Sequence, residues 1–271
     1  HRRNDETTVL IMPLQFIDTH AHLDGTEFDA DRDEMISRAR EAGVSKVFLP
    51  AIDLHTVDTV LDVCRRYPGY AYPMIGLHPE EVRADWQDVL SEMEKRLVPG
   101  HPFIAIGEVG LDYYWSREYE KEQLSAFERQ VEWSVEHRLP LMIHCRKGQN
   151  EMVNLLRHYA DELPGGVFHC FTGNAVEAEQ LLQFPRFVLG IGGVLTFKKS
   201  PLPEVLPSTV PLSRIVLETD SPYMAPVPMR GQRNESAFVK HVLTRLAQSY
   251  GVSEQEVADT TNANVSRVFG I

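Results

Sequence analysis

The 271-residue chain contains 27 Lys and Arg against 39 Asp and Glu, so its formal net charge is −12. This balance excludes a protein that coats nucleic acid over a broad surface, because such surfaces need an excess of cationic side chains. A membrane-spanning protein is excluded as well, since the longest apolar run near the start covers only residues 9–12 and a span needs roughly 20. An enzyme that uses bound cations to meet an anionic substrate remains compatible with this charge.

Eight short apolar runs recur along the chain, and each precedes an amphipathic stretch. The runs are nearly continuous in apolar residues, which is typical of parallel strands buried on both faces. In chain order the predicted strands are Leu14–Thr19, Lys46–Ala51, Ala71–Leu77, Phe103–Gly107, Leu141–Ile143, Gly166–Phe168, Phe187–Ile191 and Arg214–Glu218.

The stretches between the runs have the apolar spacing of amphipathic helices. Asn174 with Glu177, and Ser253 with Glu256, show the spacing of capping boxes at helix starts. Ser200–Pro207 is rich in proline and is the weakest helix of the set. The other predicted helices are Asp31–Ala42, Thr56–Arg66, Glu81–Leu97, Glu118–Arg138, Gln149–Tyr159 and Ala237–Ser249.

This alternation predicts an α/β fold, a single-domain (β/α)8 TIM-like barrel, whose usual size of about 250 residues fits the chain. An open doubly wound sheet is the alternative, but it usually has a glycine-rich phosphate loop after its first strand. Here that strand leads into Asp18–His22, which contains no glycine. We assign residues 13–271 to the barrel and interpret residues 1–12 as an N-terminal extension or cloning remnant without a signal peptide.

A polar residue closes most of the predicted strands. Barrel enzymes carry their chemistry at the carboxyl ends of the strands, and these positions hold side chains of metal-binding type. They are His20, His22, His78, Glu108, His144, His169 and Asp220. Residues two apart on a strand project to one side, so His20 and His22 can reach one cation. The set predicts a metal site where the loops converge.

The number of candidate ligands favours two metal ions. Four histidines and two carboxylates exceed the three protein ligands of a typical catalytic zinc site. A glutamate can also bridge two cations about 3.5–4 Å apart. In the predicted assignment one ion is held by His20, His22 and Asp220, the other by His144 and His169, and Glu108 bridges them.

The three cysteines, Cys64, Cys145 and Cys170, are too few and odd in number for a disulfide framework, so we expect a reducing, cytoplasmic compartment. Cys145 and Cys170 each follow a proposed ligand. Neighbours on a strand point to opposite faces, so both thiols should pack away from the metals. A structural zinc site is disfavoured, because its ligands would cluster in short loops.

Several motifs occur in a fixed order along the chain: DTHAHLD at Asp18–Asp24, GLHP at Gly76–Pro79, GEVGLDYY at Gly107–Tyr114, IHCR at Ile143–Arg146, HCFTG at His169–Gly173, LETDSPY at Leu217–Tyr223 and RGQRNE at Arg230–Glu235. With these motifs the sequence resembles the TatD family of metal-dependent deoxyribonucleases, within the amidohydrolase-like metal hydrolases. The match runs from about Phe16 to Phe269.

The resemblance implies a TIM-like barrel, a divalent metal centre with the same six ligands, and 3′–5′ exonuclease or DNase activity that depends on Mg²⁺. Histidine-rich sites favour Zn²⁺ or a related transition ion on ligand softness, so a purified sample is expected to carry Zn²⁺, another adventitious ion, or none. One departure stands in the loop after the fifth strand. There Lys147-Gly148 replaces the Asp-Ala that is common in the family, which leaves the substrate contacts of that loop open.

For phosphodiester hydrolysis the catalytic residues are predicted to be Asp220 and Glu108. Two cations lower the pKa of a shared water, and Asp220 takes its proton. The predicted partner is DNA, as single strands or strand ends. An alternative is an amidase or esterase on the same site, such as an aminoacyl-tRNA deacylase. A binding module without activity is poorly supported, because it gives the convergent Asp220 no purpose.

Several side chains are candidate substrate contacts. His78 and Arg146 are expected to bind phosphate, the latter as a fork. The alternatives are that Pro79 simply holds His78 in its loop and that Arg146 forms a salt bridge with a barrel carboxylate. Arg230, in the loop after the last strand, contributes to a local basic rim or is simply solvated. Tyr113, with Tyr114 and Trp115 directly after it, either stacks a base or packs within its loop.

Overall fold

The structure, a computed structural model, describes residues 13–271. The predicted extension at residues 1–12 lies outside this part. Eight parallel strands form one sheet in chain order, which confirms the predicted barrel. The strands are β1 (Phe16–Asp18), β2 (Val44–Pro50), β3 (Ala71–Ile75), β4 (Ala105–Asp112), β5 (Leu141–Arg146), β6 (Gly166–Phe168), β7 (Phe187–Ile191) and β8 (Ile215–Leu217).

Hydrogen bonds at and just beyond their carboxyl ends join the last strand, β8, to the first strand, β1. The Thr19 amide donates to the Leu217 carbonyl over 3.0 Å, and the Asp220 amide donates to the His20 carbonyl over 2.8 Å. The Asp18 carboxylate accepts from the amide of Thr219 over 3.0 Å and from its hydroxyl over 2.6 Å. These bonds close the barrel beside the predicted site.

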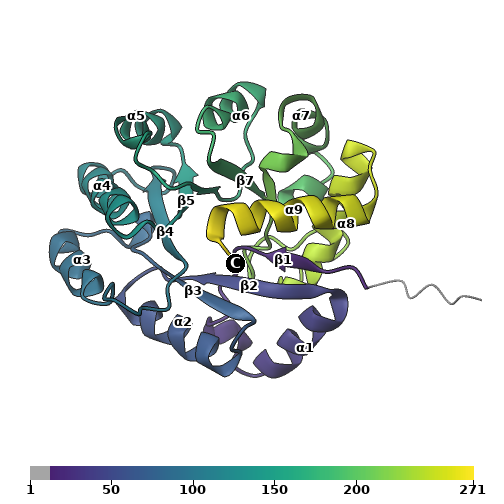
Figure 1. Cartoon of the computed structure of the whole chain (residues 1–271), viewed down its shortest axis with the longest axis horizontal. Helices are drawn as coiled ribbons and strands as arrows, with labels where there is room; N and C mark the ends of the chain where they lie inside the picture. Colours follow the sequence, from purple (N-terminus) through teal and green to yellow (C-terminus); the bar gives the residue numbers. More distant parts are fainter. Residues whose placement is uncertain (1–12) are drawn as a thin grey trace, which may run out of the picture.

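Helices surround the strands in Figure 1, and α9 lies across one end of the barrel with the C-terminus close to its axis. Within residues 13–271, no helix is both long and apolar enough to span a lipid bilayer. The helices are α1 (Arg32–Ala42), α2 (Leu54–Arg66), α3 (Trp86–Glu94), α4 (Glu120–His137), α5 (Gln149–Tyr159), α6 (Ala175–Leu182), α7 (Leu202–Thr209), α8 (Val239–Tyr250) and α9 (Glu254–Phe269).

Several elements depart from their predicted bounds by one to three residues, and two depart by more. The helix predicted over 81–97 is a 3-10 turn at Pro79–Glu81 followed by α3, because Val82 takes an extended backbone and buries its side chain. The strand predicted over 103–107 extends in β4 to Asp112, which pairs with Arg146 of β5. Glu108 therefore lies within a strand and not beyond its end.

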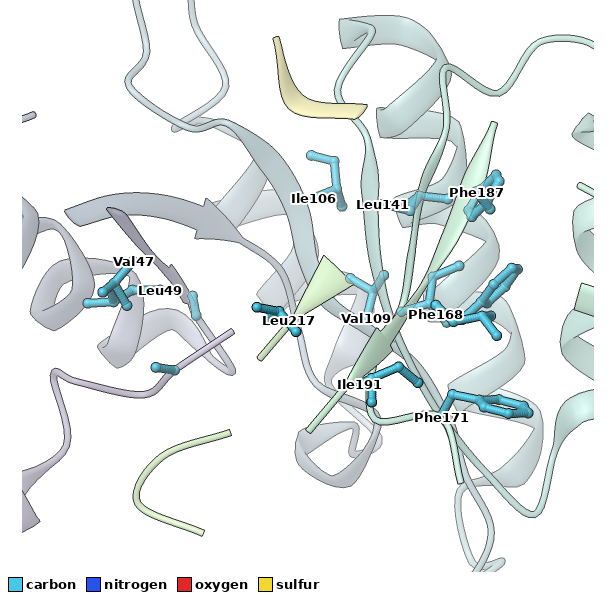
Figure 2. Packing of buried hydrophobic residues seen from close by; sticks show 14 of the residues in the cluster. Val47, Leu49, Ile106, Val109, Leu141, Phe168, Phe171, Phe187, Ile191 and Leu217 are labelled. Carbon is cyan, nitrogen blue, oxygen red and sulfur yellow. The ribbon is translucent and has the colours of Figure 1, made fainter. Parts of the chain in front are cut away.

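Each strand contributes one side chain to an apolar layer inside the barrel, and the residues next to it point outward, as the alternation of a strand requires. The inward residues form one apolar layer with Val265 and Phe269 of α9, which closes that end: Ile17, Phe48, Met74, Ala105, Met142, Val167, Val188 and Val216. The outward residues pack beneath the helices, among them Val47, Leu49, Leu141 and Phe168 in Figure 2. The opposite end of the barrel is left to polar side chains.

Candidate metal centre

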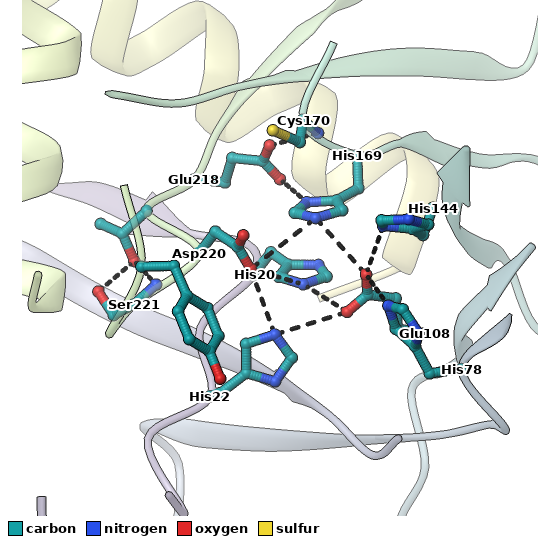
Figure 3. Close-up of polar contacts among 12 residues, drawn as sticks. His20, His22, His78, Glu108, His144, His169, Cys170, Glu218, Asp220 and Ser221 are labelled. Carbon is teal, nitrogen blue, oxygen red and sulfur yellow. Dashed lines mark hydrogen bonds and ion pairs between the residues drawn. The ribbon is translucent and has the colours of Figure 1, made fainter. Parts of the chain in front are cut away.

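The Glu108 carboxylate lies at the centre of a group of imidazoles, as Figure 3 shows. Its Oε1 lies 3.0 Å from Nε2 of His20 and 3.5 Å from Nε2 of His22. Its Oε2 lies 3.2 Å from Nε2 of His78, 3.2 Å from Nδ1 of His144 and 3.6 Å from Nε2 of His169. The structure thus brings the predicted ligands together around one carboxylate.

Asp220 lies on the other side of the same group. Its Oδ1 is 3.2 Å from Nε2 of His22, 3.4 Å from Nε2 of His20 and 3.8 Å from Nε2 of His169. Three sets of side chains offer ligand atoms within 4.8 Å of one another: His20, Glu108 and His169; His20, His22 and Asp220; His78, Glu108 and His144. His78, expected to contact phosphate, therefore also lies among the candidate ligands.

Glu108 reaches the centre because β4 is irregular at this point. The register between β4 and β5 shifts between Gly107 and Val109. Such a bulge leaves one residue out of the ladder and redirects its side chain. Gly107 helps, because a Cβ there would lie 2.5 Å from Cβ of Met142.

His144 and His169 follow the inward residues Met142 and Val167 by two positions, so they continue the inward face of β5 and β6. In each ring one nitrogen faces Glu108 and the other contacts a second carboxylate. Nε2 of His144 lies 2.7 Å from Asp112 Oδ2, and Nδ1 of His169 lies 2.7 Å from Glu218 Oε2. A second partner of this kind orients a metal-binding imidazole and fixes which nitrogen faces the ion.

Sequence reasoning missed both of these carboxylates. Glu218 follows the inward Val216 by two positions, and that spacing could have found it. Asp112 follows the bulge of β4, which changes the alternation, so spacing could not have placed it. Gly190 makes room for Glu218, because a Cβ on Gly190 would lie 2.7 Å from its Oε2.

His20 and His22 come together for a reason that differs from the expected one. β1 ends at Asp18, so both histidines lie in the loop beyond it and not on the strand. The loop is anchored by the bonds of His20 and Asp18 to the residues after β8. The two rings meet edge to face, with centroids 5.1 Å apart.

Several polar atoms at the centre have no hydrogen-bond partner in the described part of the chain. They are both ring nitrogens of His20 and Oε1 of Glu108, and all are buried. Nε2 of His20 and Oε1 of Glu108 are 3.0 Å apart but lack the alignment of a hydrogen bond. Unpaired buried polar atoms are costly. Imidazole nitrogens and carboxylate oxygens aimed at one point fit a divalent cation.

The charges of the group respond to its burial and to one another. Burial opposes ionisation of Glu108, but the nearby histidines outweigh it and hold its pKa well below the ordinary value. Burial alone would lower the pKa of His169, yet the Glu218 and Glu108 carboxylates raise it to about 10. Burial likewise opposes protonation of His144, and Asp112 and Glu108 raise its pKa to about 9. The protein presents carboxylates that attract positive charge, from protons or from a metal.

A cavity of about 460 Å³ opens over Glu108 and Asp220. Among the described residues its lining contains no Lys or Arg, and its outer part is acidic, with Asp24, Glu27, Glu80 and Glu81. Its own walls therefore offer no positive side chain to a phosphate, apart from histidines. A cation at the centre would supply that charge.

The remaining predicted substrate contacts lie outside this cavity. Tyr113 is 5% exposed and packs in the apolar core, so its ring faces are not open to a base. Arg230 stacks on Phe197 at 4.0 Å and donates to the Ala225 carbonyl. Arg146 is exposed and lies over the Tyr114 ring at 3.5 Å.

The Cys170 thiol is turned away from Glu108 in Figure 3. Cys145 and Cys170 both line a second cavity of about 280 Å³. Burial raises the pKa of the Cys145 thiol to about 12 and that of Cys170 well above its ordinary value. Among residues 13–271, the sets that could hold a metal include neither thiol.

Comparisons with known proteins find relatives over nearly the whole chain. A family model described as TatD related DNase matches residues 17–270. A Bacillus subtilis (strain 168) protein named uncharacterized metal-dependent hydrolase YabD is 34% identical over 254 residues, which cover 94% of this chain and 98% of that protein. A Cronobacter sakazakii protein named 3′-5′ ssDNA/RNA exonuclease TatD is 34% identical over 257 residues, which cover 93% and 97%.

Solved structures give the same result for the fold. The crystal structure of YJJV, a TatD homolog from Escherichia coli K12, matches with a TM-score of 0.85 and 29% identity, covering 96% of this chain and 100% of that one. A TatD family hydrolase from Entamoeba histolytica matches with a TM-score of 0.80 at 22% identity, covering 96% and 99%.

Proposed function

The chain belongs to the TatD related DNase family of metal-dependent hydrolases, and from that premise we propose that it removes nucleotides from the 3′ ends of single-stranded DNA. The observation that carries the proposal is the Glu108 carboxylate, buried on the floor of a cavity and shared by imidazoles from separate strands and from the loop after β1. Such a centre suits hydrolysis of a phosphodiester. Relatives named as exonucleases on ssDNA and RNA supply the substrate class.

We propose two divalent ions for this centre. His20, His22 and Asp220 would hold the first, His144 and His169 the second, with Glu108 between them. His78 is close enough to Glu108 and His144 to join the second set. Mg²⁺ is the proposed ion in activity, and Zn²⁺ or another transition ion the one retained on purification.

Bound cations would lower the pKa of a water and polarise the phosphoryl oxygen. The protein's own part is to place groups around that point. Glu218 and Asp112 fix the rings of His169 and His144. Asp220 lines the cavity and has one carboxylate oxygen, Oδ1, among the imidazoles, so it would accept a proton from the attacking water. Its low pKa, which the neighbouring histidines maintain against burial, keeps it ionised before that step.

The alternative hydrolase, an amidase or an aminoacyl-tRNA deacylase, has less support. The relatives that carry a named activity among those above are exonucleases. The same metals and cavity could also hydrolyse other esters. The assay described next therefore includes a panel of esters and amides.

The proposal is tested with purified protein and single-stranded DNA labelled at its 5′ end. We expect a ladder of progressively shorter labelled strands with Mg²⁺ and no shortening with EDTA. Cuts at internal positions only, or turnover of an ester and amide panel without nucleotide release, would contradict it. A 3′-blocked strand serves as the substrate control.

Glu108→Ala tests the shared carboxylate. We expect the variant to lose both ions and turnover, since it removes an oxygen from each side of the centre. Metal content per chain, measured by plasma mass spectrometry, checks this against Glu92→Ala on the exposed face of α3. Retention of two ions per chain in Glu108→Ala would show that Glu108 does not bridge them.

A further inference from the structure

Two aromatic side chains are exposed on the loop after β4. Tyr114 is 47% exposed and Trp115 is 71% exposed, whereas the preceding Tyr113 is buried. The Tyr114 and Trp115 rings meet edge to face with centroids 4.8 Å apart. A large exposed aromatic surface of this kind often marks a contact site.

Arg146 completes the cluster from β5. Its guanidinium carbon lies 3.5 Å from the centroid of the Tyr114 ring and 5.6 Å from that of Trp115. The arginine therefore occupies one face of Tyr114 and leaves most of the Trp115 indole open. In the described part of the chain no hydrogen bond or ion pair uses this guanidinium, so its N–H groups are available to a phosphate.

The cluster is tied to the metal centre through Asp112. One oxygen of this buried carboxylate accepts from the Tyr114 amide over 3.0 Å, and the other contacts Nε2 of His144 over 2.7 Å. Trp115, Asp112 and Glu80 line a cavity of about 310 Å³, and Glu80 also lines the cavity over the metal centre. A strand whose end reaches Glu108 can thus pass this cluster.

We propose that Trp115, supported by Tyr114 and Arg146, stacks an unpaired nucleobase of the substrate strand while Arg146 meets an adjoining phosphate. This rests on the proposed function. The occupant must be flat and linked to an anion, and a nucleotide has both properties. Bases in a duplex already stack on their neighbours, so the site selects single strands. Stacking uses the base alone, so it accepts DNA and RNA alike.

Binding is measured in EDTA, where no turnover occurs, with a dye-labelled oligothymidylate and fluorescence anisotropy. We expect Trp115→Ala to weaken binding about tenfold, a typical effect of losing one base–aromatic stack. Trp115→Phe keeps a ring and should bind within about threefold of the parent protein. Val98→Ala is the matched control, because Val98 is 53% exposed but lies before β4 at the opposite end of the barrel.

Intrinsic fluorescence provides a second measurement. Of the three tryptophans, Trp133 is buried and Trp86 is half-buried against the core, so Trp115 is the one most open to a base. Unlabelled oligothymidylate should quench the emission of the parent protein and not that of Trp115→Phe. A strand of the same length without bases should bind parent and Trp115→Ala equally.

The proposal is overturned if the parent protein does not bind the oligonucleotide, if Trp115→Ala binds as tightly as the parent, or if the substitution weakens the abasic strand equally. The cleavage assay separates this from the proposed function. If the oligonucleotide quenches the emission of the parent protein but the protein never shortens the strand, the stacking site is supported and the proposed nuclease activity is wrong. If the parent protein shortens the strand and Trp115→Ala binds it as tightly as the parent, the nuclease activity is supported and the stacking site is wrong.

Discussion

His169 illustrates how single residues build the centre. Its Nδ1 contacts Glu218, and its Nε2 faces Glu108 and Asp220 at 3.6 and 3.8 Å. The ring also stacks on His20 with centroids 3.5 Å apart. The carboxylate of Glu218 therefore determines both the position of the ring and which nitrogen is presented to a metal.

Glu218→Gln is expected to lower metal affinity about 10- to 100-fold, because the amide is a weaker partner for the imidazole N–H. Titration calorimetry of metal-free protein with Zn²⁺ measures the change. Glu204→Gln, which neutralises an exposed carboxylate in α7, should leave the affinity unchanged. Unaltered affinity in Glu218→Gln would mean that packing alone holds His169.

At the scale of elements, the predictable part of the site is the part that follows strand alternation. His144 and His169 lie two residues beyond inward apolar residues, so the sequence already places them. Glu108 depends on a bulge in β4, and His20 and His22 depend on a loop beyond β1. Their types suggested a role, but tertiary pairing alone determines where these side chains point.

The helices show the same division. The helix predicted at Gln149–Tyr159 has those bounds, and Asn174 makes the predicted capping box with Glu177. Both depend on local signals. The predicted helix start at residue 81 is wrong, because burial of Val82 against the core overrides the local helical pattern and α3 begins only at Trp86.

Helix α1 is fastened to the loop after β8 by an ion pair. Both oxygens of Asp31 accept from the Arg233 guanidinium, over 2.8 and 2.6 Å. These hydrogen bonds, aided by Arg38, lower the pKa of Asp31 to about 2. The pair is partly exposed, so its contribution to stability is modest.

We expect Asp31→Asn to reduce the free energy of unfolding by about 1 kcal/mol at neutral pH. A lowered pKa stabilises the folded state above the unfolded pKa of 3.8, and this stabilisation is lost as the pH falls towards about 2. The difference in Tm between parent and variant should therefore shrink between about pH 4 and pH 2 in thermal melts. Asp62→Asn, which removes an exposed pair with Arg65, serves as the control. A difference that grows in acid would refute the assignment.

At the scale of the whole molecule, the barrel has one closed end and one reactive end. Phe269 of α9 packs against Phe48 inside the barrel, with ring centroids 4.8 Å apart. We expect Phe269→Ala to lower the free energy of unfolding by about 3 kcal/mol, because it opens a cavity in this layer. Urea unfolding measures the loss, and Gln255→Ala on the exposed face of α9 should change little. Metal affinity should survive in the folded variant, and its loss would show that the two ends are coupled.

The net charge of −12 limits the number of contacts that the molecule can make with the phosphates of a polyanion. Many arginines are already paired with carboxylates, among them Arg65, Arg129 and Arg233. The cavity over the centre has no Lys or Arg among its described lining residues. Phosphate contacts should therefore be few and local, with Arg146 foremost.

Salt dependence of oligonucleotide binding tests this directly. Each neutralised phosphate of a single strand contributes about −0.7 to the slope of log K against log salt, so one or two contacts predict a slope of about −1. Anisotropy titrations in EDTA over a series of KCl concentrations give the slope. Arg146→Ala should make the slope less negative by about 0.7, whereas Arg65→Ala, whose exposed partner is Asp62, should not change it. A parent slope steeper than about −4 would require a broad cationic surface, which the distribution of charge in this chain argues against.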